Sequence, residues 1–490
     1  MPNSTDHGGL WTPGRRALTI GLVLTITLVA SEALAVSNIM PIVDRDLAGG
    51  NSELYGWVFS GFFLGNLIGI VIAGLLVDRG SLVRPFGLGL ALFSIGLFVG
   101  GVAPSMEVLV GARVVQGLGS GAIPAVAYVA IARALPEALR PRMFATMSTA
   151  WVLPGVFGPA LAGFVADAFD WRLVFLGLLP LIALAALMTL PAVAAVGPAA
   201  DVPVTEGTAD RAAANQARRR LPLALILAAG AGMLVAGLTN AQLVPGLPLI
   251  VGGGLLAAAA FRLLTPPGTL RAARGLPSAI LLRGMLTFAF FTADVYVPLA
   301  LQGWRGTSAT VAGLALTAAT LSWTAGAWTQ AHLIGRYGAR PFIRMGFLVL
   351  ALGVLGFAAI LSPAVPLPVG VAAWALAGLG MGFAYAPLSL TVLREAPPES
   401  QGAATAGLQL SDVLGTALGA GVGGALIALG HRAGAEAWVG LAWAFGIGVV
   451  AALIGAAVAG RLTARQPAAL VEAASGHAAD GIVPERLPEA

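Results

Sequence analysis

Apolar runs of about twenty residues recur along almost the whole chain. A helix needs about this length to cross the ~30 Å hydrocarbon layer of a bilayer, because it rises ~1.5 Å per residue. The runs do not alternate polar with apolar side chains, as the strands of a transmembrane barrel would. Only 10% of the 490 residues are charged and 58% are hydrophobic, which excludes an ordinary soluble protein. The sequence therefore predicts an all-α membrane protein.

The apolar runs form two blocks of six, with two further runs between them. We predict fourteen transmembrane helices, near residues 17–43, 54–77, 85–103, 107–132, 143–167, 173–195, 221–240, 243–263, 278–301, 309–333, 341–361, 367–393, 402–430 and 437–461. The first run is too long for the core of a signal peptide and lacks a small-residue cleavage site, so we expect it to be retained. The expected segments are a leader (1–16), a six-helix bundle (17–195), a linker (196–220), two extra helices (221–263), a loop (264–276), a second bundle (277–462) and a disordered tail (463–490).

The charged residues of the loops predict the orientation. The chain has 27 arginines and no lysine, and most of the arginines fall on one side of the predicted helices: only Arg45, Arg172, Arg305 and Arg432 fall on the other side, and Arg113 and Arg283 lie within helices. Positive charge accumulates on the cytoplasmic side of membrane proteins. We therefore expect a multi-pass protein of the inner (plasma) membrane with both termini, the linker and the loop at 264–276 in the cytoplasm. The net charge of +5 follows from this topology and does not indicate a nucleic-acid partner.

Two blocks of the same polarity suggest a duplicated transporter, in which two bundles move about a site near the middle of the bilayer. The loop after the second predicted helix reads GLLVDRGSLVRP (74–85), and the matching loop of the second half reads AHLIGRYGARP (331–341). The first loop resembles the G-x-L-x-D-R-x-G-R-R signature of the major facilitator superfamily. The residues that match this signature are Gly74, Leu76, Asp78 and Arg79, and Arg84 is the one basic residue nearby. The resemblance implies a loop that locks the two halves together on the cytoplasmic side; an ordinary pair of juxtamembrane charges is the alternative.

The fourth predicted helix carries ARVVQGLGSGAIPA (112–125), which resembles the family's R-x-x-Q-G-x-G pattern. The matching residues are Arg113, Gln116, Gly117 and Gly119. An arginine inside the hydrocarbon layer costs about 3 kcal/mol or more unless it reaches the surface or finds a partner. In the family this arginine is linked to proton transfer, which the resemblance implies for Arg113; a structural role is the alternative.

The fifth predicted helix places small residues at regular spacing. Gly155, Pro159 and Gly163 recur every four residues, which brings them to one face and allows close packing. Gly158, Pro159 and Gly163 also resemble, with two departures, the G-x-x-x-G-P-x-x-G-G pattern that marks exporters of the superfamily. The following segment, WRLVFLGLLP (171–180), resembles a motif of the fourteen-helix drug/proton antiporters. The alternative for the glycines is a plain helix-packing stripe.

The first predicted helix contains one carboxylate, Glu32, in the apolar stretch LTITLVASEALAVSNIMPIV (24–43). It lies about 22 Å from the cytoplasmic start of the helix, and so near the middle of the membrane. The fourteen-helix antiporters carry a similar motif, L-D-x-T-x-x-N-x-A-L-P. Glu32 and Pro41 keep its spacing from acid to proline, and Asn38 stands one place after its asparagine. We predict that Glu32 binds and releases the exchanged proton; the alternative is a fixed ion pair, for example with Arg113.

The second half supplies a further candidate for proton coupling, Asp412, with Gln409 one turn before it on the same helix face. Arg283 and Asp294 share a face of the ninth predicted helix, but about 16 Å separates them, so they are not expected to pair. Because Asp294 lies toward the outer surface, we expect it to be solvated and structural.

Aromatic and polar side chains within the predicted helices are candidates for binding an apolar or cationic substrate. They are Asn38, Gln116, Phe288, Phe291, Trp323, Tyr385 and Gln409. The alternative for the aromatic residues is ordinary packing or anchoring at the membrane surface.

The motifs give no support to enzyme or cofactor chemistry. The G-x-G-x-x-G match at 419–424 lies in a predicted membrane helix with no strand before it. The four histidines are far apart in the sequence, and none has the spacing of a metal site. No Walker loop is present, which excludes direct drive by ATP from this chain. We therefore expect no enzyme activity, no metal and no cofactor, and transport driven by an ion gradient.

These features together predict a fourteen-helix transporter of the major facilitator fold, with two six-helix bundles and two extra helices. The resemblance implies export of amphiphilic, hydrophobic or cationic small molecules in exchange for protons, as in multidrug efflux and antibiotic resistance. Export of an endogenous lipid, siderophore or metabolite is one alternative, and a receptor or scaffold without transport is another. The expected partners are a small-molecule substrate, protons and the lipid bilayer, and the expected state is a monomer.

Overall fold

The structure is a computed structural model that describes residues 9–49, 53–77, 81–136, 139–196, 208–240, 243–397 and 400–463. Helices form almost all of these residues, and no strand occurs among them. The long helices are α1 (Pro13–Ala48), α2 (Tyr55–Val77), α3 (Val83–Gly101), α4 (Met106–Ala134), α5 (Arg140–Ala168), α7 (Leu178–Ala194), α8 (Thr208–Thr239), α9 (Leu243–Leu264), α10 (Leu276–Asp294), α11 (Ala309–Tyr337), α12 (Ala339–Ala358), α13 (Leu367–Glu395), α14 (Gln401–Arg432) and α15 (Ala437–Val458). The short ones are α6 (Arg172–Leu176), the π-helix η3 (Leu299–Trp304), and the 3-10 helices η2 (Thr269–Arg271), η4 (Ala359–Leu361) and η6 (Ala459–Arg461). The predicted all-α membrane fold is confirmed.

In the part of the chain that the structure describes, twelve helical stretches are long and apolar enough to cross a membrane. The two other helices among the predicted fourteen are α5 and α11. In α5, the apolar stretch whose side chains are described without a gap is Leu153–Ala168, and α11 contains several threonine, serine and glutamine residues. These two helices pack against each other, so part of the surface of each faces protein instead of lipid.

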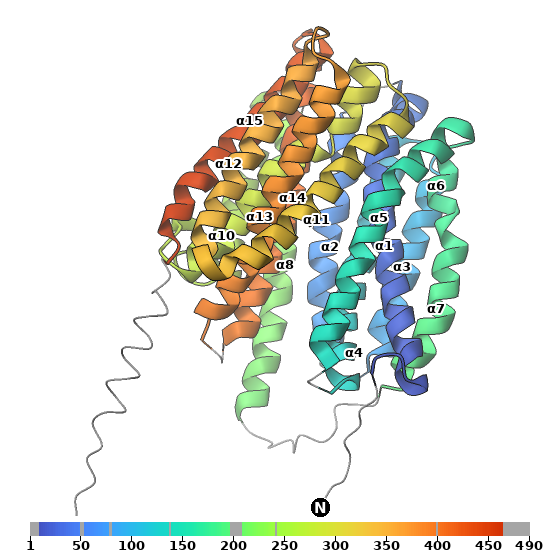
Figure 1. Cartoon of the computed structure of the whole chain (residues 1–490), viewed down its shortest axis with the longest axis vertical. Helices are drawn as coiled ribbons and strands as arrows, with labels where there is room; N and C mark the ends of the chain where they lie inside the picture. The colour runs from blue at the N-terminus through green and yellow to red at the C-terminus, as the bar shows by residue number, and fades with distance from the viewer. Residues whose placement is uncertain are drawn as a thin grey trace, which may run out of the picture.

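The helices form two bundles, α1–α7 and α10–α15, which lie side by side (Figure 1). Two seams join the bundles: α5 packs against α11 along one, and α2 packs against α14 along the other. The arrangement matches the duplicated architecture that the two six-helix blocks of the sequence suggested.

The two extra helices, α8 and α9, form a hairpin that packs on the second seam. A cluster of buried apolar side chains joins Leu64 and Leu67 of α2, Leu227 of α8, and Leu410 and Leu414 of α14. Because α8 contacts both bundles here, it covers the seam between α2 and α14.

Glycines bring α4 close to its neighbours and so fix the position of Arg113. A Cβ at Gly117 would collide with the backbone carbonyl of Phe62 on α2, and one at Gly119 would meet the backbone of Phe93 on α3. Close backbone approach of this kind needs residues without a side chain. The glycines of the R-x-x-Q-G-x-G pattern therefore hold α4 against α2 at Gly117 and against α3 at Gly119, starting one turn after the arginine.

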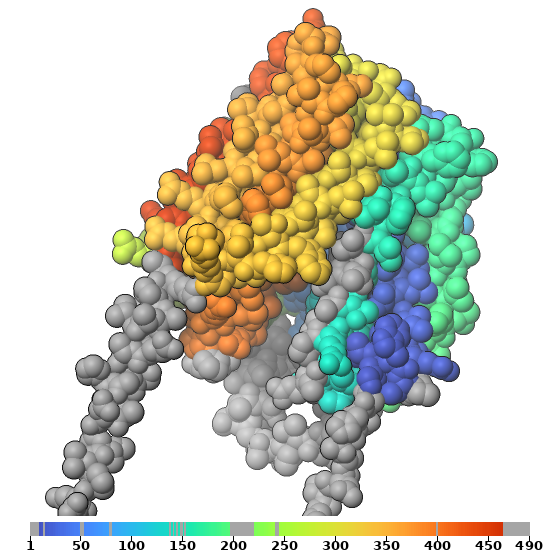
Figure 2. All heavy atoms as spheres, viewed as in Figure 1, coloured from blue at the N-terminus to red at the C-terminus, as the bar shows by residue number. Residues whose placement is uncertain are grey.

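The two bundles are not joined equally along their length. Both ends of the described chain lie toward the lower end of the view in Figure 1, which we call the terminal end; the opposite end, where α5 stops and α11 begins, is the far end. In the space-filling view, the bundles are in contact at the far end and separate toward the terminal end (Figure 2). The structure is therefore closed between the bundles at the far end.

Candidate functional site

The first buried charge pair joins α1 to α4 inside the first bundle. Glu32 and Arg113 form an ion pair, and their side chains are 1% and 2% exposed. The structure thus pairs Glu32 with Arg113, which was the alternative to Glu32 as the residue that exchanges the proton. This pair gives the arginine the partner that it requires within the hydrocarbon layer.

Arg113 has further partners besides Glu32. Its Nη1 donates to Oε1 of Gln116 at 2.6 Å, its Nε donates to the carbonyl oxygen of Val58 at 3.2 Å, and its guanidinium lies 4.1 Å from the ring centroid of Phe62. Oε2 of Glu32 and Nε2 of Gln116, in contrast, are buried without a hydrogen-bond partner in the described part of the chain. The arginine therefore keeps three neutral partners when Glu32 loses its charge.

The second buried charge pair lies in the other bundle and joins α10 to α14. Nε of Arg283 donates to Oδ1 of Asp412 at 3.0 Å, and the hydroxyl of Tyr385 on α13 donates to Oδ2 at 2.9 Å. The guanidinium lies 3.1 Å from the ring centroid of Tyr385. Asp412 and Tyr385 were predicted as site residues from the sequence, but Arg283 was not recognised as their partner. The available signal was that a buried arginine and a buried aspartate in the same half each need an opposite charge.

A row of aromatic rings connects the two charge pairs. In order, the rings belong to Phe62, Phe63, Phe291, Phe290, Trp323 and Tyr385, and adjacent centroids are 5.3–6.0 Å apart. The step from Phe63 to Phe291 crosses from the first bundle to the second. Phe63, Phe291, Trp323 and Tyr385 are only partly buried, so part of each ring is accessible. Partly accessible rings suit an apolar, aromatic or cationic ligand.

Asp294, the last residue of α10, differs from the other two acids. It is only 8% exposed, so the expectation of a solvated residue is wrong. As expected, it does not pair with Arg283, which is engaged with Asp412. Across the described ranges, no hydrogen bond or ion pair reaches its carboxylate. Asp294 is therefore a buried acid that has no compensating cation among the described residues.

At the far end, side chains of the first bundle bond to the backbone of the second. Nδ2 of Asn38 donates to the carbonyl oxygens of Pro159 at 2.7 Å and of Ala309 at 2.9 Å. The carboxylate of Asp167, at the end of α5, accepts hydrogen bonds from the N–H groups of Ala309 at 3.3 Å and Thr310 at 3.0 Å. A carboxylate is favoured at a helix start because the first N–H groups have no partner within the helix. Asn38, a predicted substrate residue, thus lies fully buried in a contact between the bundles.

The small residues of α5 face two different neighbours. One stripe packs across the seam on α11, where the contact pairs are Gly155 with Thr320, Pro159 with Gly313, and Gly163 with Ala309. Gly158 faces α1 instead, and a Cβ there would lie 3.8 Å from the carbonyl oxygen of Ser31, an ordinary contact. The first stripe leads, one turn later, to Asp167. This spacing was the signal that could have identified Asp167 from the sequence.

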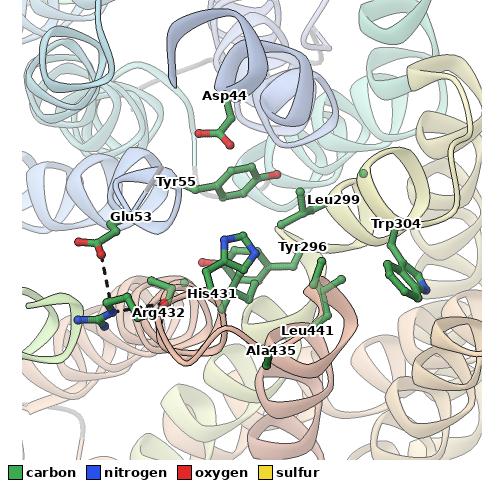
Figure 3. A pocket seen from close by; sticks show the side chains of 15 residues that line it. Asp44, Glu53, Tyr55, Tyr296, Leu299, Trp304, His431, Arg432, Ala435 and Leu441 are labelled. Atoms are coloured by element: carbon green, nitrogen blue, oxygen red, sulfur yellow. Dashed lines mark hydrogen bonds and ion pairs between the residues drawn. The ribbon is translucent and has the colours of Figure 1, made fainter. Parts of the chain in front are cut away.

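A cavity of about 650 Å³ lies at the far end, where α2 meets α14 (Figure 3). Tyr55 of the first bundle and Tyr296 of the second line it, with ring centroids 5.6 Å apart. The hydroxyl of Tyr55 donates to the carbonyl oxygen of Val295 at 3.5 Å, and Glu53 forms an ion pair with Arg432 at 3.7 Å. The walls of the cavity therefore hold the two bundles together at this end.

The remaining predicted residues lie apart from the charge pairs. Gln409 and Phe288 are partly buried on α14 and α10. A Cβ at Gly74 would have no atom of a neighbouring element within 4 Å, so Gly74 is not a close-packing point, and Arg84 is exposed at the start of α3. Two predicted residues lie outside the described ranges: Asp78 and Arg79. Within those ranges, no three histidine or acidic side chains lie together in a way that could hold a metal ion.

Two six-helix bundles with paired seams define the class of the protein as a helical membrane transporter. The sequence model of the Major Facilitator Superfamily matches residues 20–293 and 279–484. The chain belongs to this family, as the motifs predicted. Solved structures with the same fold include a D-xylose-proton symporter, with 15% identity, a TM-score of 0.62, and coverage of 90% of this chain and 97% of that one. A peptide transporter has 15% identity and a TM-score of 0.65, with coverage of 90% and 94%.

Several bacterial relatives resemble the chain over most of its length. A probable multidrug-efflux transporter of Mycobacterium tuberculosis is 29% identical over 483 residues, which cover 93% of this chain and 97% of the relative. The multidrug resistance protein Stp of the same organism is 28% identical over 83% of this chain and 74% of its own length. A triacylglyceride transporter of Mycolicibacterium hassiacum is 28% identical over 85% of this chain and 79% of its own length.

The glycines of α5 allow a direct test of the far-end contact. A Cβ at Gly163 would lie 2.5 Å from the carbonyl oxygen of Ala309 and 2.8 Å from Nδ2 of Asn38, so Gly163→Ala should push α5 away from α11 at a cost of about 1–3 kcal/mol. Gly158→Ala is the matched control on the same helix. Because the chain contains no cysteine, a single Thr317→Cys reporter on α11 can be labelled with a maleimide in purified protein. Thr317 is 9% exposed and its hydroxyl donates to the carbonyl oxygen of Val156 on α5 at 3.1 Å, so it lies at the seam. We expect faster labelling with Gly163→Ala only, and equal rates for the two variants would contradict the close approach.

Proposed function

We propose that this transporter exports hydrophobic or cationic amphiphilic small molecules from the cytoplasm in exchange for protons. In this proposal the terminal end faces the cytoplasm, as the distribution of arginines predicts. The structure then corresponds to an inward-facing state, with the bundles in contact on the outer side and separated on the cytoplasmic side (Figure 2). The relatives that are named multidrug-efflux and multidrug resistance proteins support this class of substrate.

The observation that carries the proposal is the environment of Glu32. Its carboxylate is 1% exposed inside a membrane-spanning helix, and one of its two oxygens has no hydrogen-bond partner in the described ranges. A proton can therefore be added to Oε2 without displacing an existing bond. Arg113 remains held by Val58, Gln116 and Phe62 when the ion pair weakens. The site can change its charge without losing its structure.

Proton exchange at Glu32 links the two sides of the membrane through the motion of the bundles. In an outward-facing state, water from the more acidic side reaches Glu32, and the carboxylate binds a proton. In the inward-facing state, the ion pair with Arg113 reforms and the proton leaves to the cytoplasm. The proton gradient then favours one direction of the cycle, because the two states differ in their affinity for the proton.

The row of aromatic rings supplies the surface for the substrate. It crosses between the bundles at Phe63 and Phe291, so a molecule that stacks there contacts both moving parts. Trp323 and Tyr385 extend this surface to Arg283 and Asp412. Both carboxylate oxygens of Asp412 already accept hydrogen bonds, from Arg283 and Tyr385, whereas Oε2 of Glu32 has no partner in the described ranges, so we assign Asp412 the smaller part in proton coupling.

A second candidate function is export of an endogenous lipid or another metabolite. The similarity to a protein named as a triacylglyceride transporter favours the lipid form of this alternative. Proteoliposomes that move a fluorescent triacylglyceride but no cationic dye would support it. Ligand binding without any flux would instead support a receptor that does not transport.

The proposed orientation predicts which loops are reachable from outside the cell. Single cysteines at Ser81, before α3, and at Ala433, after α14, lie at exposed positions at opposite ends of the bundles. We expect a membrane-impermeant maleimide to label Ala433→Cys in intact cells, and Ser81→Cys only after the membrane is opened. The reverse pattern would invert the proposed direction of transport.

Glu32→Gln tests the proton site. Glutamine keeps the shape and hydrogen bonding of Glu32 but cannot titrate, so the variant should fold and bind a cationic dye yet lose dye accumulation driven by a pH gradient in inside-out vesicles. Glu107→Gln, at an exposed acid at the start of α4, is the matched control and should transport as the wild type does. We expect Asp412→Asn to give a milder loss that depends on the substrate. Full gradient-driven transport by Glu32→Gln would remove Glu32 from the mechanism.

A further inference from the structure

We propose that Asp294 is the place in the transport path where the positive group of a cationic substrate replaces a proton. The inference rests on the proposed proton-coupled export and names the carboxylate that recognises the charge of the substrate. It assigns a function to an acid that the proposed cycle at Glu32 does not use.

The charge balance of the buried acids separates Asp294 from the others. Glu32 is paired with Arg113, and Asp412 is paired with Arg283. No such partner reaches Asp294 from the described residues, although it is 92% buried, with 8% of its surface exposed. An isolated ionised carboxylate in a low-dielectric interior is strongly disfavoured. Asp294 is therefore suited to two states: protonated when no cation is present, and ionised beside a cation.

The geometry of α10 directs Asp294 toward the junction of the bundles. An α-helix turns about 100° per residue. Viewed along the axis of α10, Asp294 therefore points about 20° away from the direction of Arg283, and its direction lies between the directions of Phe290 and Phe291. Phe290 contacts Trp323 of α11, and Phe291 contacts Phe63 of α2 across the bundles. Asp294 therefore lies about one turn beyond the aromatic row, on the same side of the helix.

The contacts around Asp294 also provide a route to the far end. Asp294 does not itself line the far-end cavity, but Tyr296, two residues later, does. The carbonyl of Val295, the next residue, accepts the hydrogen bond from Tyr55 of the other bundle. Separation of the bundles at the far end breaks this contact and parts the two tyrosine rings. The same motion that opens the outer side thus opens the cavity toward Asp294.

The exchange at Asp294 balances in protons and charge. In the inward-facing state, the apolar body of the substrate lies against Phe63 and Phe291, whose rings are partly accessible, and its positive group reaches the carboxyl group. The O–H bond of the carboxyl group breaks, the proton passes to water on the open side, and the cation and the carboxylate form an ion pair without a covalent bond. In the outward-facing state, a proton from the outer side replaces the cation, which leaves through the opened far end.

Other titratable or charged side chains near α10 are engaged elsewhere or line the far-end cavity. They are Tyr55 with Val295, Tyr296 with Ala420, Arg283 with Asp412 and Tyr385, Glu32 with Arg113, and Glu53 with Arg432, while Asp44 and His431 lie in the cavity wall. Glu32 is the other acid to which the proposed cycle assigns a proton, so Glu32→Gln is measured in parallel. Proton release on cation binding that persists in Glu32→Gln and is lost in Asp294→Asn is attributed to Asp294.

The test measures binding and proton release together in purified full-length protein. Tetraphenylphosphonium is added in weakly buffered solution that contains a pH indicator, and its uncharged relative triphenylphosphine oxide is added in parallel. The wild type should release protons on binding the cation. Asp294→Asn should bind the cation about thirtyfold more weakly and release few protons, because it cannot ionise. Asp294→Glu should retain both properties, and Asp170→Asn, at an exposed acid, is the matched control. All variants should bind triphenylphosphine oxide equally.

A second measurement needs no variant and covers the case in which Asp294→Asn does not fold. Dicyclohexylcarbodiimide modifies protonated buried carboxyl groups, and mass spectrometry of peptides locates the modified residue. We expect tetraphenylphosphonium, but not triphenylphosphine oxide, to protect Asp294 in the wild type. Wild-type affinity and proton release in a folded Asp294→Asn variant, or absence of protection, would overturn the inference. Loss of gradient-driven efflux in the wild type would instead overturn the proposed function, because binding and protection are measured without a gradient.

Discussion

The cost of charge in the hydrocarbon layer determines how this protein is built. A charged side chain at the middle of a bilayer costs about 3 kcal/mol or more, so it must have a partner or face water. Arg113 and Arg283 satisfy this requirement in the same way, each through one carboxylate and one aromatic ring. In each bundle, the pair joins helices that are distant in the sequence, and so it constrains how those helices pack.

The same constraint explains what could be predicted from the sequence. The length and apolar character of the runs were sufficient for the helices, and the spacing of glycines identified the close contacts of α4 and α5. Glu32 and Asp412 were recognised as costly acids within their helices, and Arg113 was named as an alternative partner of Glu32. Arg283 was not recognised as the partner of Asp412, because partners depend on which helices are neighbours. The arrangement of neighbouring helices is set by packing across the whole bundle, and the periodicity of one helix does not reveal it.

The burial of Asp294 was missed for a related reason. Its position in the sequence suggested the surface, but the chain continues after it through η3, and Asp294 is buried.

The two seams between the bundles have different chemistry. The seam between α5 and α11 is lined by small residues and ends in hydrogen bonds at the start of α11. There Asn38 donates to the carbonyl oxygen of Ala309, and Asp167 accepts from the N–H groups of Ala309 and Thr310. These bonds lie at the far end and can break without exposing a large apolar surface. The seam between α2 and α14 is covered by α8 through a cluster of apolar side chains. Separating that cluster from either bundle would expose apolar surface, or require lipid to replace it. The α8–α9 hairpin therefore restrains the seam of α2 and α14 more than the seam of α5 and α11. When the bundles move, we expect the seam of α5 and α11 to open more readily.

The order of the acids along the path bears on the energetics of transport. Glu32 and Asp412 lie at the two ends of the aromatic row, each neutralised by an arginine, so neither charge pair presents a net charge to a substrate. A cation that enters between the bundles is attracted by the aromatic rings but meets no net negative charge until it reaches Asp294.

If Glu32 and Asp294 each exchange one proton per cycle, two protons enter for each monovalent cation that leaves, and one net positive charge crosses inward. A negative potential on the inner side then drives export together with the pH gradient. With a neutral substrate, Asp294 keeps its proton throughout, one proton enters at Glu32, and one net positive charge again crosses. In the proposed cycle, a second acid that has no partner among the described residues thus gives cations and neutral molecules the same net charge movement.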